Sequence, residues 1–131
     1  MVPEFSSYKI SPKHRVPNKP SKAVSVWTVS KWDEVQLFVT AYDKNWWYED
    51  DQILWAIMVK DSKMSKIGED LNNDLYIAKY RCDSNLEWHG YPVHPKEVQD
   101  IPPHKVLKEW YDNNLISKRD KCKIQKGQFF V

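Results

Sequence analysis

The densest group of reactive side chains lies between Glu87 and Pro95, where Glu87, His89 and His94 fall within nine residues. Histidine titrates near neutral pH, and a carboxylate beside it can orient the ring or share a proton, as general acid–base cleavage of a phosphodiester requires. On a strand, Glu87 and His89 share one face and Trp88 points to the other. These three residues form the candidate catalytic set. The simpler interpretation, which we favour, is that Trp88 packs in the core and the histidines cap a loop.

A second candidate site is an aromatic loop with acidic neighbours. Aromatic rings in a loop can stack on bases, on a sugar or on a partner's side chain, or they can anchor the loop in the core. The acidic residues would repel phosphate, so the loop favours a protein partner over nucleic acid. The candidate partner-binding residues are Trp46, Trp47, Tyr48, Glu49, Asp50 and Asp51.

The net charge of +2 hides an uneven distribution along the chain. Residues 1–22 and 104–131 are both basic, whereas 23–103 is acidic. Clustered charge steers association, so the basic ends favour a charged partner, unless the N-terminal segment folds back onto the acidic middle. Basic side chains near the C-terminus can contact phosphates, which makes them the alternative nucleic-acid-binding site. They are Lys118, Arg119, Lys121, Lys123 and Lys126.

Motifs for metals and nucleotides are missing from the sequence. The chain has three glycines, and neither a dinucleotide-binding nor a P-loop pattern can be written with them. Cys82 and the histidines lack the CxxC, HxxxH or HExxH spacing that holds two zinc ligands on one turn. We therefore expect no cofactor and no metal. The two cysteines are too few for a disulfide framework, and a reducing, cytoplasmic location is the default expectation.

Local patterns predict the elements that position these residues. Ser30 and Asp33 resemble a helix N-cap, and an apolar face follows at helical spacing, so we predict a helix over 31–43 with that face in the core. The face consists of Trp32, Val35, Val39 and Tyr42, with Phe38 close to it. The apolar run 53–59 predicts a buried strand. Residues 75–82 and 86–91 predict two more strands that complete an antiparallel meander, and 23–29 predicts a short strand or an extended entry.

The ends of the chain have distinct characters. Residues 1–22 contain four prolines and predict an extended basic arm without a helix, separate from a single domain over 23–131. Helices are expected at 103–113 and 118–126, the second capped by Ser117. The predicted fold is α+β, with a small antiparallel sheet of about three strands, one helix on its N-terminal side and a pair of helices at the C-terminus.

Length and composition limit the possible functions. The chain has 131 residues, of which 41% are hydrophobic and 29% charged, which is typical of one soluble globular domain. The longest apolar run has seven residues, far below the roughly 20 of a membrane span. The sequence favours a Trp-rich, charge-segregated module that binds a macromolecule, most simply a protein, as immunity proteins, antitoxins, inhibitors and complex subunits do. The alternative is an RNA-directed protein, either a metal-independent ribonuclease or a non-catalytic RNA binder.

Overall fold

The computed structural model of the protein describes residues 7–21, 24–47 and 52–129. Within these ranges the α-helices are α1 (Lys31–Asp43), α2 (His104–Asp112) and α3 (Lys118–Gln125), with single-turn 3-10 helices η1 (Pro12–His14) and η2 (Val98–Asp100). The strands are β1 (Ser7–Tyr8), β2 (Val26–Trp27), β3 (Ile53–Lys60), β4 (Lys63–Ser65), β5 (Gly68–Glu69), β6 (Asp74–Leu75), β7 (Ile77–Cys82) and β8 (Glu87–Val93).

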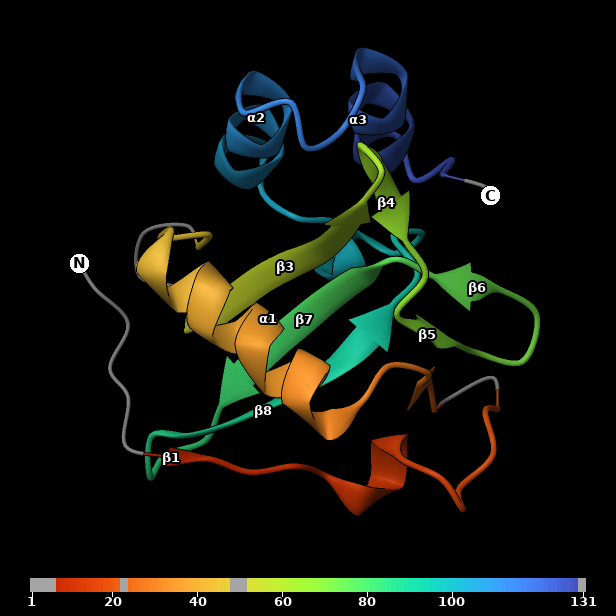
Figure 1. Ribbon diagram of the computed structural model, residues 1–131, viewed down its shortest axis with the longest axis vertical. Coiled ribbons are helices and arrows are strands. Elements are labelled where there is room, and N and C mark those ends of the chain that lie inside the picture. The colour runs from red at the N-terminus through yellow and green to blue at the C-terminus, as the bar shows by residue number, and fades with distance from the viewer. Residues whose placement is uncertain (1–6, 22–23, 48–51, 130–131) are drawn as a thin grey trace.

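The larger sheet has five strands in the order β1-β8-β7-β3-β4 (Figure 1). β3, β7 and β8 form an antiparallel meander, in which Tyr80 lies opposite Gly90. β4 returns antiparallel along the end of β3, whereas β1 runs parallel to β8 and pairs Ser7 with Glu87. The sheet is therefore mixed, because β1, which comes from the N-terminal segment, is parallel to its neighbour while the other strand pairs are antiparallel.

A second, three-stranded antiparallel sheet has the order β2-β5-β6. The α+β class and the meander are confirmed, but the prediction of a single sheet of about three strands is wrong. The reason is length: β1, β2, β5 and β6 have two residues each, too few to show a periodic pattern. Their pairing depends on partners far along the chain. The second sheet contacts the first through Trp27 Nε1, which donates to Gly90 O, and Ser25 Oγ, which donates to Pro92 O.

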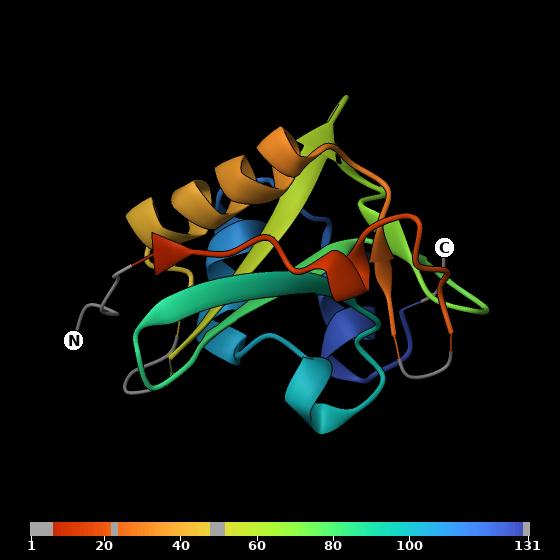
Figure 2. The same cartoon turned by 90° about the horizontal axis from the view of Figure 1, so that it is seen from below.

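Both faces of the main sheet are covered, as consecutive buried residues in β3 and β7 indicate. On one face, the Tyr80 hydroxyl donates to Glu34 O of α1 at 2.8 Å. Gly90 permits this arrangement, because a Cβ there would lie 2.2 Å from the Tyr80 ring. On the other face, Lys79 Nζ donates to Gln99 O and contacts Asp100 of η2. Figure 2 shows α1 on one side of the sheet and η2 on the other.

Helix α1 has the predicted bounds and cap, since Ser30 Oγ accepts from the Asp33 amide at 3.1 Å. Its predicted buried face is wrong. Trp32 is 71% exposed and Val39 41% exposed, and of the predicted face only Phe38 is buried. The other buried residues of α1 are Glu34, Leu37 and Ala41. The helix is rotated about its axis relative to the prediction because its most deeply buried polar group, the Glu34 carboxylate, has partners that the local pattern does not reveal.

Those partners come from the N-terminal segment. Arg15 Nε and Nη2 donate to Glu34 Oε1 at 3.1 and 2.8 Å, Arg15 Nη1 donates to Val29 O, and the Tyr8 hydroxyl donates to Glu34 Oε2. Lys9 N also donates to Trp88 O. Residues 7–15 therefore pack against α1 and β8, and the segment contains the 3-10 turn η1 where no helix was predicted. This contact joins part of the basic end to the acidic middle of the chain.

The C-terminal helices are confirmed close to their predicted positions. Ser117 Oγ caps α3 by accepting from the Asp120 amide at 3.0 Å, as predicted. Val106, Leu107 and Trp110 of α2 and Ile124 of α3 point into the hydrophobic core. Across the described part of the chain, no helix has the length and apolar character needed to cross a membrane.

Candidate functional site

A groove of about 720 Å³ lies on the face of the sheet opposite α1. One wall comes from η1 and the residues before β2, the floor from β8, and the other wall from the segment between β8 and η2. Three of the four histidines, His14, His89 and His94, line it together with Tyr91. The groove, called the histidine groove below, falls in the size range of ligand-binding pockets, roughly 300–1,000 Å³.

Strand geometry places the groove's floor. His89 and Tyr91 are two residues apart on β8, so their side chains lie on the same face of the sheet. Lys79 of β7 pairs with Tyr91 and lies on that face too. The His14 ring stacks on Tyr91 with 5.1 Å between centroids and 18° between planes. The His89 ring also stacks against Tyr91, at 6.5 Å and 27°. One tyrosine thus contacts two imidazoles, one from η1 near the N-terminus and one from β8.

The hydrogen bonding of His14 defines its neutral form. Its Nδ1 lies 2.7 Å from Ser25 O, and because a carbonyl only accepts, Nδ1 must carry the proton. The unprotonated nitrogen of the neutral ring is therefore Nε2. Pro12 begins the 3-10 turn that carries His14, and the next residue, Arg15, is fixed to Glu34. The backbone of His14 is consequently fixed by the residues that precede and follow it in the sequence.

Two pKa shifts accompany this arrangement. Burial is the main cause that lowers the pKa of His14; the hydrogen bond to Ser25 opposes it, and the nearby charges of Lys13 and His89 add to the lowering. Burial also raises the pKa of Tyr91, against the effect of the neighbouring Arg81 guanidinium. His14 is thus neutral and Tyr91 is protonated at neutral pH. The site combines a basic ring nitrogen with a hydroxyl donor.

Charged groups in the groove are unequally available. Lys13 and Lys96 line it as cations. Asp100 faces the buried Lys79, with 3.3 Å between Oδ1 and Nζ, and Asp70 Oδ1 accepts from the amides of Asn72 and Asn73. Glu97 lines the groove as well. Since Asp70 and Asp100 already have donors within the protein, an anionic group finds its attraction at Lys13 and Lys96.

The predicted catalytic set is only partly brought together. His89 and His94 both line the histidine groove, whereas Glu87 lies at the start of β8, where its carboxylate accepts from Ser7 Oγ at 3.4 Å. The sequence prediction missed His14, which lies in the segment predicted to be an extended basic arm. The available signal was its position in Pro-Lys-His-Arg, a basic stretch that could fold back onto the acidic middle.

The aromatic loop contributes to the core. Trp46 and Trp47 are 5% and 7% exposed, and Trp46 packs edge-to-face on Trp110 of α2 with 5.7 Å between centroids. Lys105 Nζ lies 5.1 Å from the centre of the Trp47 ring and donates to Trp47 O. Both rings are thus occupied by contacts within the chain. The other four predicted partner-binding residues, 48–51, lie outside the described residues.

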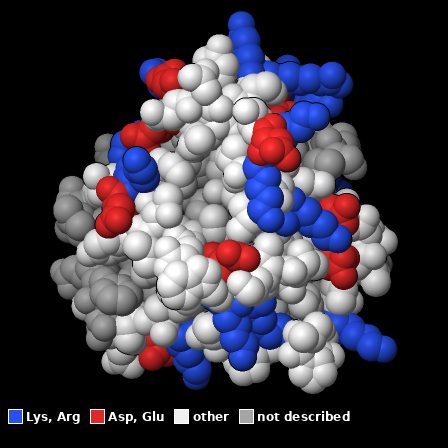
Figure 3. All heavy atoms as spheres, in the orientation of Figure 1, with Lys and Arg blue, Asp and Glu red and all other residues white. Residues whose placement is uncertain are grey.

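The predicted nucleic-acid-binding residues lie along α3 and just after it. Lys118, Arg119 and Lys126 are exposed, while Lys121 Nζ lies 5.6 Å from the Tyr111 ring centre. Figure 3 shows basic side chains at the top of the molecule, where α3 lies in Figure 1, with acidic side chains beside them. Only the end of this region reaches the histidine groove, through Gly127.

No group of three or more His, Cys, Asp or Glu residues with the placement of a metal site occurs among the described residues. Comparisons of the chain with protein-family models, with curated proteins and with solved structures give no match. The functional argument therefore rests on the histidine groove itself.

Proposed function

We propose that the protein acts on RNA, using the histidine groove for general acid–base cleavage of a phosphodiester. The observation that carries this proposal is the pair of imidazoles stacked on Tyr91, one of them with a defined basic nitrogen, beside two lysines. RNA supplies its own nucleophile, the 2′-hydroxyl, so the protein needs only a base, an acid and cations for the phosphate.

The proposed reaction assigns one role to each group. His14 Nε2 removes the proton from the 2′-hydroxyl, and the 2′-oxygen forms a bond to phosphorus. The bond from phosphorus to the 5′-oxygen breaks, and His89 donates a proton to that oxygen as the general acid. The products are a 2′,3′-cyclic phosphate and a free 5′-hydroxyl. Lys13 and Lys96 balance the charge of the phosphate, and Tyr91 holds both rings and donates through its hydroxyl.

The test uses a fluorogenic oligoribonucleotide and its 2′-deoxy counterpart at neutral pH. We expect the ribose form alone to be cleaved, and mass spectrometry to identify the cyclic phosphate. His14→Asn keeps a donor for Ser25 O but removes the base, so cleavage should fall about 10² to 10⁴-fold. His104→Gln is the matched control, because His104 is exposed at the start of α2 and lies outside the groove.

Two outcomes would contradict the proposal. Equal cleavage of the ribose and deoxyribose substrates excludes the 2′-hydroxyl as nucleophile. Full cleavage by a folded His14→Asn variant excludes His14 as the base.

A second candidate function is binding of a protein partner, and one observation favours it. Trp32 is 71% exposed on α1, with Val39 also exposed one helical repeat of seven residues further on, so α1 presents apolar side chains to solvent. The test is the native mass of the protein isolated from its own cells. A stoichiometric companion protein present with the wild type and lost with Trp32→Ala supports this candidate, and a companion retained by Trp32→Ala argues against it.

A further inference from the structure

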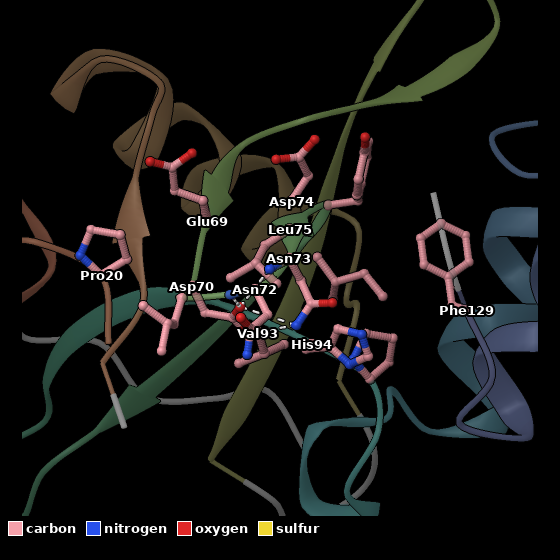
Figure 4. Close-up of a pocket in the computed structure, with 14 residues that line it drawn as sticks. Pro20, Glu69, Asp70, Asn72, Asn73, Asp74, Leu75, Val93, His94 and Phe129 are labelled. Carbon is pink, nitrogen blue, oxygen red and sulfur yellow. Dashed lines mark hydrogen bonds between the residues drawn. The ribbon is translucent and has the colours of Figure 1, made fainter. Parts of the chain in front are cut away.

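A second cavity of about 470 Å³ opens directly from the histidine groove. The two share the lining residues Asp70, Asn73, Leu75, Val93 and His94. This second cavity, called the Tyr76 pocket below, continues past His94 to Tyr76 and Phe129, as the close-up in Figure 4 shows for Phe129. The two cavities are therefore adjacent, and one ligand can contact both.

The electrostatics of the Tyr76 pocket differ from those of the groove. Glu69 and Asp74 line it and share one cation, Lys66, whose Nζ lies 3.0 and 3.1 Å from their carboxylates. Asp70 lines both cavities, so its charge does not distinguish them. With two further carboxylates that share one lysine, the Tyr76 pocket disfavours a phosphate and suits a neutral, polar group. The lysines of the histidine groove favour the phosphate, so the two cavities suit different parts of one molecule.

Hydrogen bonds fix the polar group at the junction. Asp70 Oδ1 accepts from the amides of Asn72 and Asn73 at 2.9 and 2.8 Å, and from Asn73 Nδ2 at 3.0 Å (Figure 4). Asn73 Nδ2 also donates to Asp70 Oδ2 at 3.3 Å. The Asn73 side chain is thereby oriented, and its Oδ1 can accept from a ligand while Nδ2 faces Asp70. An amide oxygen complements the amino group on the edge of a nucleobase, as that of Asn does with adenine.

The aromatic pair supplies a stacking surface. Tyr76 and Phe129 meet edge-to-face at 5.9 Å between centroids. Phe129 is buried and holds the Tyr76 ring, while Tyr76 is only partly buried and borders the pocket. Stacking on an aromatic side chain is a principal means by which proteins hold unpaired bases.

From these observations we infer that the Tyr76 pocket is a nucleobase subsite, which holds the base next to the phosphate bound in the histidine groove. The inference rests on the proposed function and extends it: the substrate is single-stranded RNA of at least two nucleotides. A base within a duplex is paired and stacked, so its edge and face are not available to Asn73 and Tyr76.

The test measures binding rather than cleavage. The probe is a dinucleoside monophosphate that carries 2-aminopurine and is 2′-O-methylated, so that it cannot be cleaved. We expect the fluorescence of the probe to be quenched when it binds to the wild type. Tyr76→Leu should lower the affinity by about tenfold, whereas Tyr76→Phe, which keeps the ring, should bind as the wild type does. Asn73→Ala should also weaken binding, and Tyr111→Leu, an exposed tyrosine outside the pocket, should not. Circular dichroism confirms that each variant is folded.

The outcomes separate this inference from the proposed cleavage. Quenching that Tyr76→Leu abolishes supports the subsite even if no RNA is cleaved. Equal affinity of wild type, Tyr76→Leu and Asn73→Ala overturns the subsite even if RNA is cleaved. An affinity for the dinucleotide no greater than that for 2-aminopurine riboside 5′-monophosphate overturns it as well.

Discussion

His14 is the proposed general base, and several contacts in the structure fix its ring. It lies outside the main sheet, yet its ring stacks on Tyr91 and its Nδ1 is fixed by Ser25 O. The cause of its lowered pKa is chiefly burial, so the folded protein disfavours the imidazolium. A base that is neutral at working pH and has one free nitrogen is what abstraction of a hydroxyl proton requires.

The lowered pKa of His14 has a consequence for stability. Between the folded pKa and the ordinary value of 6.5, the unfolded chain binds more protons than the folded one. The free energy of unfolding should therefore fall as the pH drops below about 6.5, with a slope from this group of at most about 1.4 kcal/mol per pH unit. Urea unfolding between about pH 5 and 8 measures it. His14→Asn should flatten the slope, and His104→Gln should not; the same slope in wild type and His14→Asn would contradict the assignment.

At the scale of elements, residues 7–15 of the N-terminal segment contact α1 and β8. The sequence analysis predicts that 1–22 is an arm separate from the domain, and if so its removal should leave the unfolding midpoint unchanged. The contacts favour the opposite outcome, because removal of residues 1–21 takes Arg15 and Tyr8 from the Glu34 carboxylate, which is 0% exposed. Breaking a buried ion pair costs about 3–5 kcal/mol, so we expect a loss of at least that size in chemical unfolding. A midpoint equal to that of the full chain would restore the separate-arm interpretation.

The aromatic loop after α1 allows a matched pair of substitutions. Trp47→Ala removes a ring that is 7% exposed and should destabilise the protein by about 3 kcal/mol or more. Trp32→Ala removes a ring of the same type that is 71% exposed and should change stability by less than about 0.5 kcal/mol. Thermal or urea unfolding of the two variants decides between core and interface for Trp47. A small loss of stability with Trp47→Ala would contradict a core role and favour Trp47 as an interface residue.

Features that depend on neighbours close in the sequence were predicted, and features that depend on partners far along the chain were missed. The caps at Ser30 and Ser117 depend on residues three positions away, and both helices begin where predicted. The buried face of α1 depends on Glu34, whose partners Arg15 and Tyr8 lie 19 and 26 positions away. A buried glutamate resembles a surface residue until those partners are known. His14 was missed for the same reason, because its partners Ser25 and Tyr91 belong to other elements.

At the scale of the whole molecule, the proposed RNA path predicts which cations matter. Each phosphate contact on single-stranded nucleic acid contributes about 0.7 to the slope of log affinity against log salt. Combining Lys13→Gln with Lys96→Gln in the histidine groove should reduce that slope by about 1.4 for a non-cleavable oligonucleotide. The control combines Lys118→Gln with Arg119→Gln at the start of α3, away from the groove, and should leave the slope unchanged. If the α3 pair carries the salt dependence instead, the interface lies on the basic face that the sequence predicted.

The contacts along β8 have a further consequence, for self-association. A strand at the edge of a sheet invites pairing with another chain when its backbone groups are free. Here the carbonyls of Leu86 and Trp88 accept from the backbone of residues 7 and 9, and those of Gly90 and Pro92 accept from the side chains of Trp27 and Ser25. Pro92 also has no amide hydrogen to offer. Every second carbonyl from 86 to 92 thus accepts a hydrogen bond within the protein. This edge of β8 is therefore protected against edge-to-edge aggregation, even though β1 pairs with only the first two residues of β8.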